Sequence, residues 1–290
     1  MDNGNVIELL GSGRAFADLS YWRKVGISGS DALQWLDDLV TADLSDLAPG
    51  RARHALLLSP TGGVRASFTV ADPGGSLLLV QDPTQPVPIQ KLLAPYVLSS
   101  DVTMEDRTSA LATFAFPGRG EAPDAPGTEH SAPSCLGTEA GVDLFAPGEN
   151  HDFLLRSLSQ HHAHAGNEDV EAWRIAVGIS RFGIDALEGD LPQESGLGRA
   201  VSREKGCFPG QEAVAKVDSL GHPRRLVMAF EANGPASPGD PVLLDGSEVG
   251  EITSVTTSGE RTFLLARLRW EARGAELHTG LGTELRRRAA

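Results

Sequence analysis

Hydrophobic residues follow two different spacings in the first hundred residues of the chain. A spacing of three to four residues predicts a helix that opens at Ser28 to Asp31 and carries Leu33, Leu36 and Leu39 on one face. A second helix is expected over residues 89–97, where Pro95 should shorten it. Between them, apolar runs separated by glycine-rich turns predict an antiparallel meander. The expected strands are residues 54–58, 64–70 and 77–80.

The middle of the chain continues this mixture of short strands and helices. The patterns predict strands over residues 102–105, 111–116 and 142–145, and helices over residues 152–162 and 168–177. Residues 117–133 are dense in proline, glycine, alanine and serine and have no apolar periodicity. We therefore expect a mobile surface loop there, between two strands of one lobe.

The C-terminal part of the chain has a different pattern of apolar residues and turns. Beyond His222-Pro223, short apolar runs alternate with Pro-Gly and Asp-Gly turns, which predicts a small β-barrel over residues 223–290. Residues 1–222 combine helices with antiparallel strands, so the expected fold class is α+β. We expect this part to form two lobes that are discontinuous along the chain, one of them built mainly from about residues 50–165.

Composition narrows the class of protein. A chain of 290 residues can bury its own core without disulfides, and two cysteines are too few for a secreted disulfide framework. The net charge of −14 argues against direct nucleic-acid binding. We see neither a signal peptide nor an apolar stretch of the ~18 residues that a membrane span needs. We expect a cytoplasmic protein with no membrane contact.

A group of histidines could suggest a metal site. His161 and His164 would share a helix face, with His151 and His162 nearby. Because no acidic or cysteine partner stands at metal-site spacing, we expect an exposed helix end and no metal.

The clearest chemical signal is the segment Lys205-Gly206-Cys207-Phe208-Pro209-Gly210-Gln211-Glu212. The two glycines that flank Cys207 permit positive φ values and close approach of a ligand. Arg203, Lys205 and a helix expected to start at Gln211 bring positive charge near the thiol, which favours the reactive thiolate. The alternative is a turn that holds a buried, inert cysteine.

This segment resembles the K-G-C-Y-x-G-Q-E signature of the YgfZ-type folate-binding family, with Phe208 in place of the tyrosine. The likeness extends over the whole chain and includes residues 41–43, 58–64, 173–175 and 191–194. It implies an aminomethyltransferase-like folate-binding fold with lobes around a central hole. That hole would hold tetrahydrofolate or a one-carbon derivative of it. The family's role is to support the assembly or repair of iron–sulfur enzymes, which would then be the partners.

The resemblance also implies functional residues. Cys207 and Lys205 would be catalytic. The other members of the motif would support them: Gly206, Phe208, Gly210, Gln211 and Glu212. The folate would contact Arg174, Gln193 and Glu194.

The chain departs from the aminomethyltransferase relatives at two places. Where they carry two carboxylates after a Gly-Gly turn, this chain has Ala66 and Ser67, which cannot accept a proton at pH 7. Ala176 stands at the position of their pterin-binding glutamate. We therefore do not expect glycine cleavage. Three hypotheses stay open: a folate-dependent accessory protein with a working Cys207, a one-carbon transferase, and a non-catalytic binding scaffold.

Overall fold

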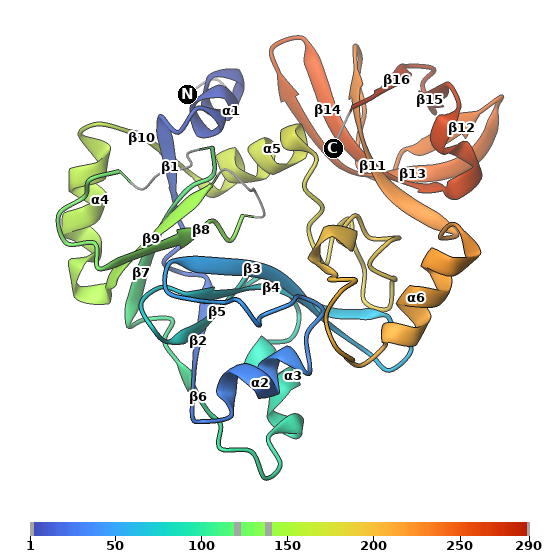
Figure 1. Ribbon diagram of the computed structural model, residues 1–290. Coiled ribbons are helices and arrows are strands. Elements are labelled where there is room, and N and C mark those ends of the chain that lie inside the picture. The colour runs from blue at the N-terminus through green and yellow to red at the C-terminus, as the bar shows by residue number, and fades with distance from the viewer. Residues whose placement is uncertain (1–2, 119–122, 137–140, 289–290) are drawn as a thin grey trace.

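The computed structural model describes residues 3–118, 123–136 and 141–288. Within these residues the chain forms two five-stranded sheets, helices packed against them, and a closed six-stranded barrel (Figure 1). Apart from one parallel pair, the strands pair antiparallel. The predicted α+β class and the small C-terminal barrel are confirmed.

One sheet is the predicted meander with two flanking strands, in the order β3-β4-β5-β2-β6. Its elements are β2 (Arg23–Ser28), β3 (Arg51–Leu58), β4 (Val64–Asp72), β5 (Leu77–Gln81) and β6 (Thr103–Asp106). Two helices, α2 (Ala32–Asp37) and α3 (Ile89–Leu93), cover one face, where Trp35 and Leu93 pack against Leu57. Since neighbouring side chains of a strand point to opposite faces, Leu56 and Leu58 lie on the other face of the sheet and are buried in a separate apolar cluster.

These two helices differ in extent from the prediction. Helix α2 begins at Ala32, because Ser28 is the last residue of β2 and makes no cap. Helix α3 ends at Leu93 and continues as a 3₁₀ turn, η1 (Ala94–Tyr96), because Pro95 cannot donate the next helical hydrogen bond.

The other sheet has the order β10-β1-β7-β9-β8 and joins distant parts of the chain. Its strands are β1 (Ala15–Asp18), β7 (Leu111–Phe116), β8 (His130–Pro133), β9 (Val142–Pro147) and β10 (Ala163–Ala165), with β1 and β10 parallel. Its helical elements are α1 (Asn3–Gly11), η2 (Gly148–Asn150), α4 (His151–Ser159) and α5 (Asn167–Val177). Along the chain, the strands of the first sheet come between β1 and β7. Residues 50–165, which we expected to build most of one lobe, therefore contribute strands to both sheets.

The predicted loop of residues 117–133 is partly wrong. Residues 119–122 lie outside the described residues. Residues 130–133 form β8, which pairs with β9, and Ala125 and Ala132 are buried. Small residues without periodicity can still form an edge strand, because the backbone hydrogen bonds to β9 hold it in place.

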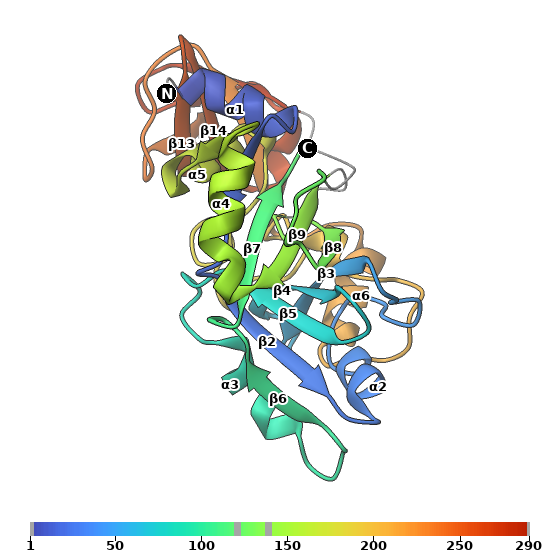
Figure 2. The ribbon, with the colours of Figure 1, turned by 90° about the vertical axis from the view of Figure 1, so that its left-hand side faces the viewer.

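The barrel begins at Arg225 and has its own core around Phe230, Val242 and Leu264. Its elements are β11 (Arg225–Ala232), β12 (Pro241–Leu244), β13 (Ser247–Ser258), β14 (Arg261–Arg269), η4 (Trp270–Gly274), β15 (Leu277–Thr279) and β16 (Glu284–Arg287). Helices α1 and α5 lie beside it in both views (Figures 1 and 2). Between α5 and the barrel, the chain forms η3 (Gly198–Ala200) and α6 (Gln211–Leu220). Of the described helices, none has the length and apolar character that would let it cross a membrane.

Candidate functional site

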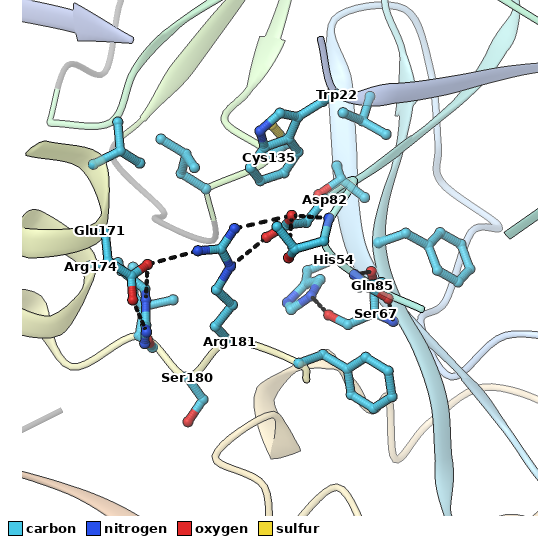
Figure 3. Close-up of a pocket in the computed structure, with 18 of the residues that line it drawn as sticks. Trp22, His54, Ser67, Asp82, Gln85, Cys135, Glu171, Arg174, Ser180 and Arg181 are labelled. Carbon is cyan, nitrogen blue, oxygen red and sulfur yellow. Dashed lines mark hydrogen bonds and ion pairs between the residues drawn. The ribbon is translucent and has the colours of Figure 1, made fainter. Parts of the chain in front are cut away.

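A cavity of about 330 Å³ lies between the first sheet, the segment after β8, α5 and the loop that follows α5 (Figure 3). This volume is within the range of small-molecule sites, ~300–1,000 Å³. Trp22, Phe68 and Phe182 give it apolar walls. Its polar lining comes mainly from His54, Ser67, Asp82, Gln85, Glu171 and Arg181. Aromatic walls with a few convergent polar groups suit a flat, polar ligand.

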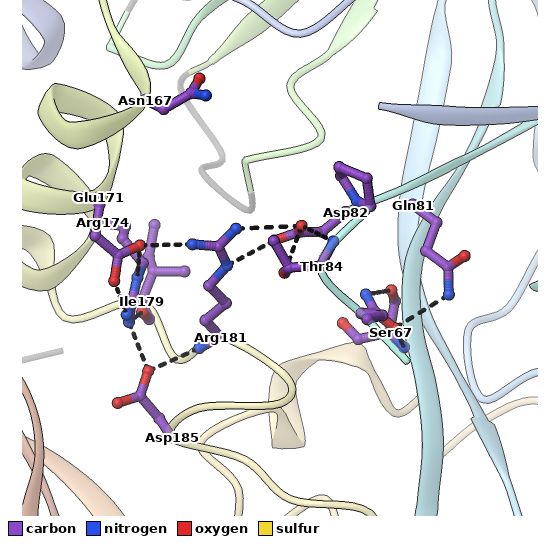
Figure 4. A network of polar contacts seen from close by, with 12 residues as sticks. Ser67, Gln81, Asp82, Thr84, Asn167, Glu171, Arg174, Ile179, Arg181 and Asp185 are labelled. Carbon is purple, nitrogen blue, oxygen red and sulfur yellow. Dashed lines mark hydrogen bonds and ion pairs between the residues drawn. The ribbon is translucent and has the colours of Figure 1, made fainter. Parts of the chain in front are cut away.

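Arg181 crosses this cavity as a bridge between two carboxylates (Figures 3 and 4). Its Nε lies 2.7 Å from Asp82 Oδ2 and its Nη2 lies 3.2 Å from Asp82 Oδ1, while its Nη1 lies 2.8 Å from Glu171 Oε2. Asp82 follows β5 and Glu171 belongs to α5, so one guanidinium joins the two sides of the cavity. The planar fork of arginine makes the Asp82 contact bidentate.

The bridge keeps both carboxyl groups ionised. Burial works against the charged form of Asp82, but the hydrogen bond and charge of Arg181 outweigh it and lower the pKa of that carboxyl. For Glu171, burial is likewise outweighed by Arg174 and Arg181, and its pKa also lies below the usual value. The cavity therefore offers negatively charged oxygens at neutral pH.

Arg174, a predicted folate contact, lines the cavity, but its guanidinium group is already hydrogen-bonded to other residues of the chain. Its side chain is 7% exposed; Nη1 lies 2.5 Å from Asp185 Oδ2, and Nη2 bonds Glu171 and, at 2.9 Å, Ser254 Oγ. Asp185 also accepts hydrogen bonds from the hydroxyls of Thr253 and Ser254 in β13. Arg174 thus positions Glu171 and ties α5 to the barrel.

His54 and Ser67 stand side by side in the opposite wall (Figure 3). His54 Nε2 lies 2.8 Å from Ser67 Oγ. Burial lowers the pKa of His54 to about 4, so the imidazole is neutral at pH 7. Of the two positions that carry carboxylates in the aminomethyltransferases, only Ser67 faces the cavity, because Ala66 is buried in the core under α2 and α3.

Cys135 also reaches the cavity wall, next to Trp22 (Figure 3). Its backbone N–H donates to Asp143 Oδ2 at 2.8 Å. Burial, reinforced by the Asp143 carboxyl, raises the pKa of the Cys135 thiol well above its usual value. This cysteine belongs to the cavity wall rather than to a mobile loop.

The Lys205–Glu212 motif lies outside the cavity and is anchored by its lysine. Lys205 Nζ lies 2.5–3.1 Å from the carbonyl oxygens of Asp37, Val40 and Ala42 and from Asp37 Oδ1. Its side chain is 2% exposed, and the ammonium also lies 5.8 Å from the centroid of the Phe208 ring. These contacts fix the motif to the chain segment after α2.

Two further motif residues hold the fold together. Phe208 is buried against Leu56 and Leu58, on the face of β3 that α2 does not cover. Gly210 has φ +84°, and a Cβ there would lie 2.5 Å from Ser59 O. Gly206 does not adopt a positive φ and has open space around it.

The rest of the motif is placed at the surface. Cys207 is exposed. Helix α6 begins at Gln211 as predicted, and Glu212 is exposed in its first turn. Arg203 Nε contacts Asp218 Oδ2 at 3.1 Å, so this cation is paired. Cys207 is not among the residues that line the cavity.

The other two predicted folate contacts do not line the cavity either. Gln193 Nε2 donates to Val214 O and to Asp218 Oδ1, both at 3.1 Å, and so braces α6. Glu194 Oε2 accepts from the backbone N–H of Leu191 at 3.3 Å. The turn that carries them packs against α6 through Gln193.

The four histidines do not share one helix face. Helix α4 ends at Ser159, and His164 lies in β10, stacked on Phe16. His151 lies 2.8 Å from Asp18 Oδ2. Among the described residues, no group of three or more metal-binding side chains comes together.

Sequence comparison relates the chain to aminomethyltransferases. Residues 11–120 match the family model of the GCVT N-terminal domain. The chain is 26% identical to an aminomethyltransferase of Streptomyces avermitilis, over 82% of this chain and 73% of the relative. It is 23% identical to a chloroplastic protein of Arabidopsis thaliana provisionally named a transferase, over 88% of this chain. The chain spans 65% of the length of that relative.

A comparison with solved structures also relates the fold of this chain to an aminomethyltransferase. The crystal structure of glycine cleavage system aminomethyltransferase T from Bartonella henselae superposes with a TM-score of 0.78 at 16% identity, over 97% of this chain and 86% of that one. The fold is therefore the aminomethyltransferase-like fold. The sequence matches further support membership of the GcvT-like superfamily.

Proposed function

We propose that the chain is a tetrahydrofolate-binding accessory protein that supports the assembly or repair of iron–sulfur enzymes in the cytoplasm. The observation that carries folate binding is the central cavity with its aromatic walls and charged carboxylates. The aminomethyltransferase-like fold and the GcvT-like relatives support a folate-related, transferase-like protein.

The lining residues fit the pterin end of a folate. A pterin is flat, and its amino-pyrimidinone edge donates hydrogen bonds that suit a carboxylate. Asp82 and Glu171 supply ionised oxygens, and Trp22 and Phe182 supply apolar surface. Arg181 holds both carboxylates in place from between them. The folate itself would supply the one-carbon chemistry.

Aminomethyl transfer is disfavoured as the alternative. Ser67 Oγ and His54 Nε2 form a neutral pair where a transferase of this kind needs a carboxylate. A neutral pair gives little stabilisation to a cationic one-carbon intermediate. We therefore expect no turnover with glycine and a lipoylated carrier.

Cys207 is the group that we assign to contact with a partner. Its thiol is exposed while its neighbours Lys205 and Phe208 are buried, so the motif presents the cysteine on a rigid base. The engagement of Lys205 with Asp37 also favours a second candidate, in which the motif is purely structural. Cys207→Ser separates the two, because only a working thiol is lost.

The first test is calorimetric titration with tetrahydrofolate under anaerobic conditions, together with thermal melting. A ligand that binds only the folded chain must raise the melting temperature. We expect Asp82→Asn to weaken binding by about tenfold, since a charged hydrogen bond contributes ~1.5–3 kcal/mol. Glu105→Gln, at an exposed pair with Arg107, is the matched control. Absence of both heat and stabilisation with the wild-type chain would refute folate binding.

The accessory role needs a cellular test. In cells that lack this protein, the activity of an iron–sulfur enzyme is compared after complementation with wild type, Cys207→Ser or Cys135→Ser. We expect Cys207→Ser alone to fail while its melting temperature stays unchanged. Full complementation by Cys207→Ser would favour the scaffold.

A further inference from the structure

His54 and Ser67 form a hydrogen-bonded pair that is held rigidly in the cavity wall. In the β3–β4 ladder Leu56 pairs with Ser67 and His54 pairs with Thr69, so the two side chains are diagonal neighbours on one face of the sheet. Both line the cavity, and 2.8 Å separates Nε2 from Oγ.

The backbone N–H and carbonyl groups of Ser67 are both held by the side chain of Gln85. On one side Ser67 pairs with Leu56 of β3, and on the other side β5 has already ended its pairing, at Thr69 with Val80. The side chain of Gln85 takes the place of the missing strand: its Oε1 accepts from Ser67 N at 3.1 Å and its Nε2 donates to Ser67 O at 2.5 Å. Gln85 is 4% exposed and is itself held by Gln81. Contacts of this kind, behind the residue that faces the ligand, fix the orientation of a functional side chain.

We propose that His54 and Ser67 act as a reversible donor–acceptor pair, which lets the cavity bind a pterin in either its reduced or its fully oxidised state. This inference rests on the proposed folate function and specifies which folates the site takes. His54 and Ser67 are specificity-determining residues in this role.

The chemistry of the pair carries the inference. A neutral imidazole has one N–H and one bare nitrogen, and a hydroxyl both donates and accepts. When His54 Nε2 bears the proton, it donates to Ser67 Oγ, and the hydroxyl hydrogen is free for an acceptor on the ligand. When Nδ1 bears the proton, Nε2 accepts the hydroxyl hydrogen, and Oγ accepts from a donor on the ligand. Burial keeps the imidazole neutral, so both arrangements are available at pH 7.

Pterins differ in this respect between their oxidation states. The ring nitrogens N5 and N8 both bear hydrogens in tetrahydrofolate and donate, whereas both are bare acceptors in folic acid. An ionised carboxylate can only accept, so it would favour the reduced form. The His54–Ser67 pair can satisfy either ring, because the tautomer of His54 changes with the ligand.

The test compares the dissociation constants of tetrahydrofolate and folic acid by anaerobic calorimetry. We expect the two constants to agree within about tenfold for the wild type, which is ~1.4 kcal/mol. Ser67→Asp should change their ratio by about tenfold or more toward tetrahydrofolate, because an unsatisfied buried acceptor pair costs ~1–3 kcal/mol. Ser67→Ala should weaken both ligands alike. Ser219→Ala, at an exposed serine of α6, is the matched control and should leave both constants unchanged.

A spectroscopic readout separates this role from a structural one. In protein labelled with ¹⁵N-histidine, we expect the His54 ring nitrogens to report opposite tautomers in the two complexes. The same tautomer in both, a wild-type preference above about a hundredfold, or a Ser67→Asp ratio equal to that of wild type would each overturn the inference. If tetrahydrofolate binds in those cases, the proposed folate-binding function stands and only the role of the His54–Ser67 pair is refuted. If neither folate binds, the proposed folate-binding function and this inference are both refuted.

Discussion

The two cysteines are distinguished by their surroundings more than by their sequence neighbours. Cys207 is exposed, and the two cations that precede it in the sequence are already paired, Lys205 with Asp37 and Arg203 with Asp218. Cys135 lies in the cavity wall, where burial raises the pKa of its thiol. Because only the thiolate attacks an alkylating agent, reactivity should differ between them.

We expect iodoacetamide at pH 7.5 to modify Cys207 at least ~10-fold faster than Cys135 in the folded chain. Tetrahydrofolate should slow the reaction of Cys135 further and leave Cys207 unchanged, because only Cys135 lines the cavity. Mass spectrometry of each peptide over time provides the rates. Equal rates before denaturation, or protection of Cys207 by the folate, would contradict this assignment.

Sequence reasoning at this scale succeeded for local features and missed non-local ones. The need for glycine at 210 and the helix start at Gln211 follow from neighbours within the motif. Asp82 and Arg181 are 99 residues apart, and no periodicity or spacing relates them. They meet because the fold places the loop after α5, which carries Arg181, next to the end of β5, which Asp82 follows.

At the scale of elements, the motif and the β3–β4 hairpin interlock through two glycines. Gly210 and Gly62 both have φ +84°, and a Cβ on Gly210 would lie 2.9 Å from Gly62 Cα. The two backbones therefore touch where any side chain would separate them. The motif is held against the hairpin that carries Ser67.

Gly210→Ala should destabilise the fold by ~2–4 kcal/mol, from the left-handed backbone and the overlap with Ser59 O. Gly206→Ala, in the same motif but with open space around it, should change stability by less than ~0.5 kcal/mol. Urea unfolding of both variants measures the difference. A Gly210→Ala chain as stable as Gly206→Ala would show that the contact is not tight.

The elements themselves were predicted where the apolar pattern was long. The β3–β4–β5 meander and the helix over residues 167–177 match their periodicity closely. Strand β8 was missed because its four residues, His130–Pro133, carry no alternation of their own and depend on pairing with β9.

On the scale of the whole molecule, one buried carboxylate joins the barrel to the rest. Asp185 is 0% exposed and binds Arg174 of α5, the backbone of Arg181, and the hydroxyls of Thr253 and Ser254 in β13. The same residue therefore supports the barrel contact and the loop that carries Arg181 into the cavity. The geometry of the ligand site depends on the docking of the barrel.

Asp185→Asn should lower the free energy of unfolding by ~3–5 kcal/mol, because Arg174 would keep a buried charge with one ionic partner fewer. Glu8→Gln, which removes an exposed partner of Arg14, should cost less than ~1 kcal/mol. Chemical denaturation of both variants at pH 7 is the measurement. A loss below 1 kcal/mol for Asp185→Asn would mean that other contacts hold the barrel in place, among them the buried ion pair of Arg267 in β14 with Asp190.

The joining of β1 to both β7 and β10 bears on how the chain is synthesised. Ala15 pairs with Ala163, and Ala17 pairs with Ala115, so β1 must wait for partners about a hundred and more residues later. The strands between them, from Arg23 to Asp106, have a complete sheet and core of their own. On the ribosome this inserted sheet can fold first, while the N-terminal strand stays unpaired until its partners emerge. Strand β1 is thus among the last elements to reach its native place, although it is made before them.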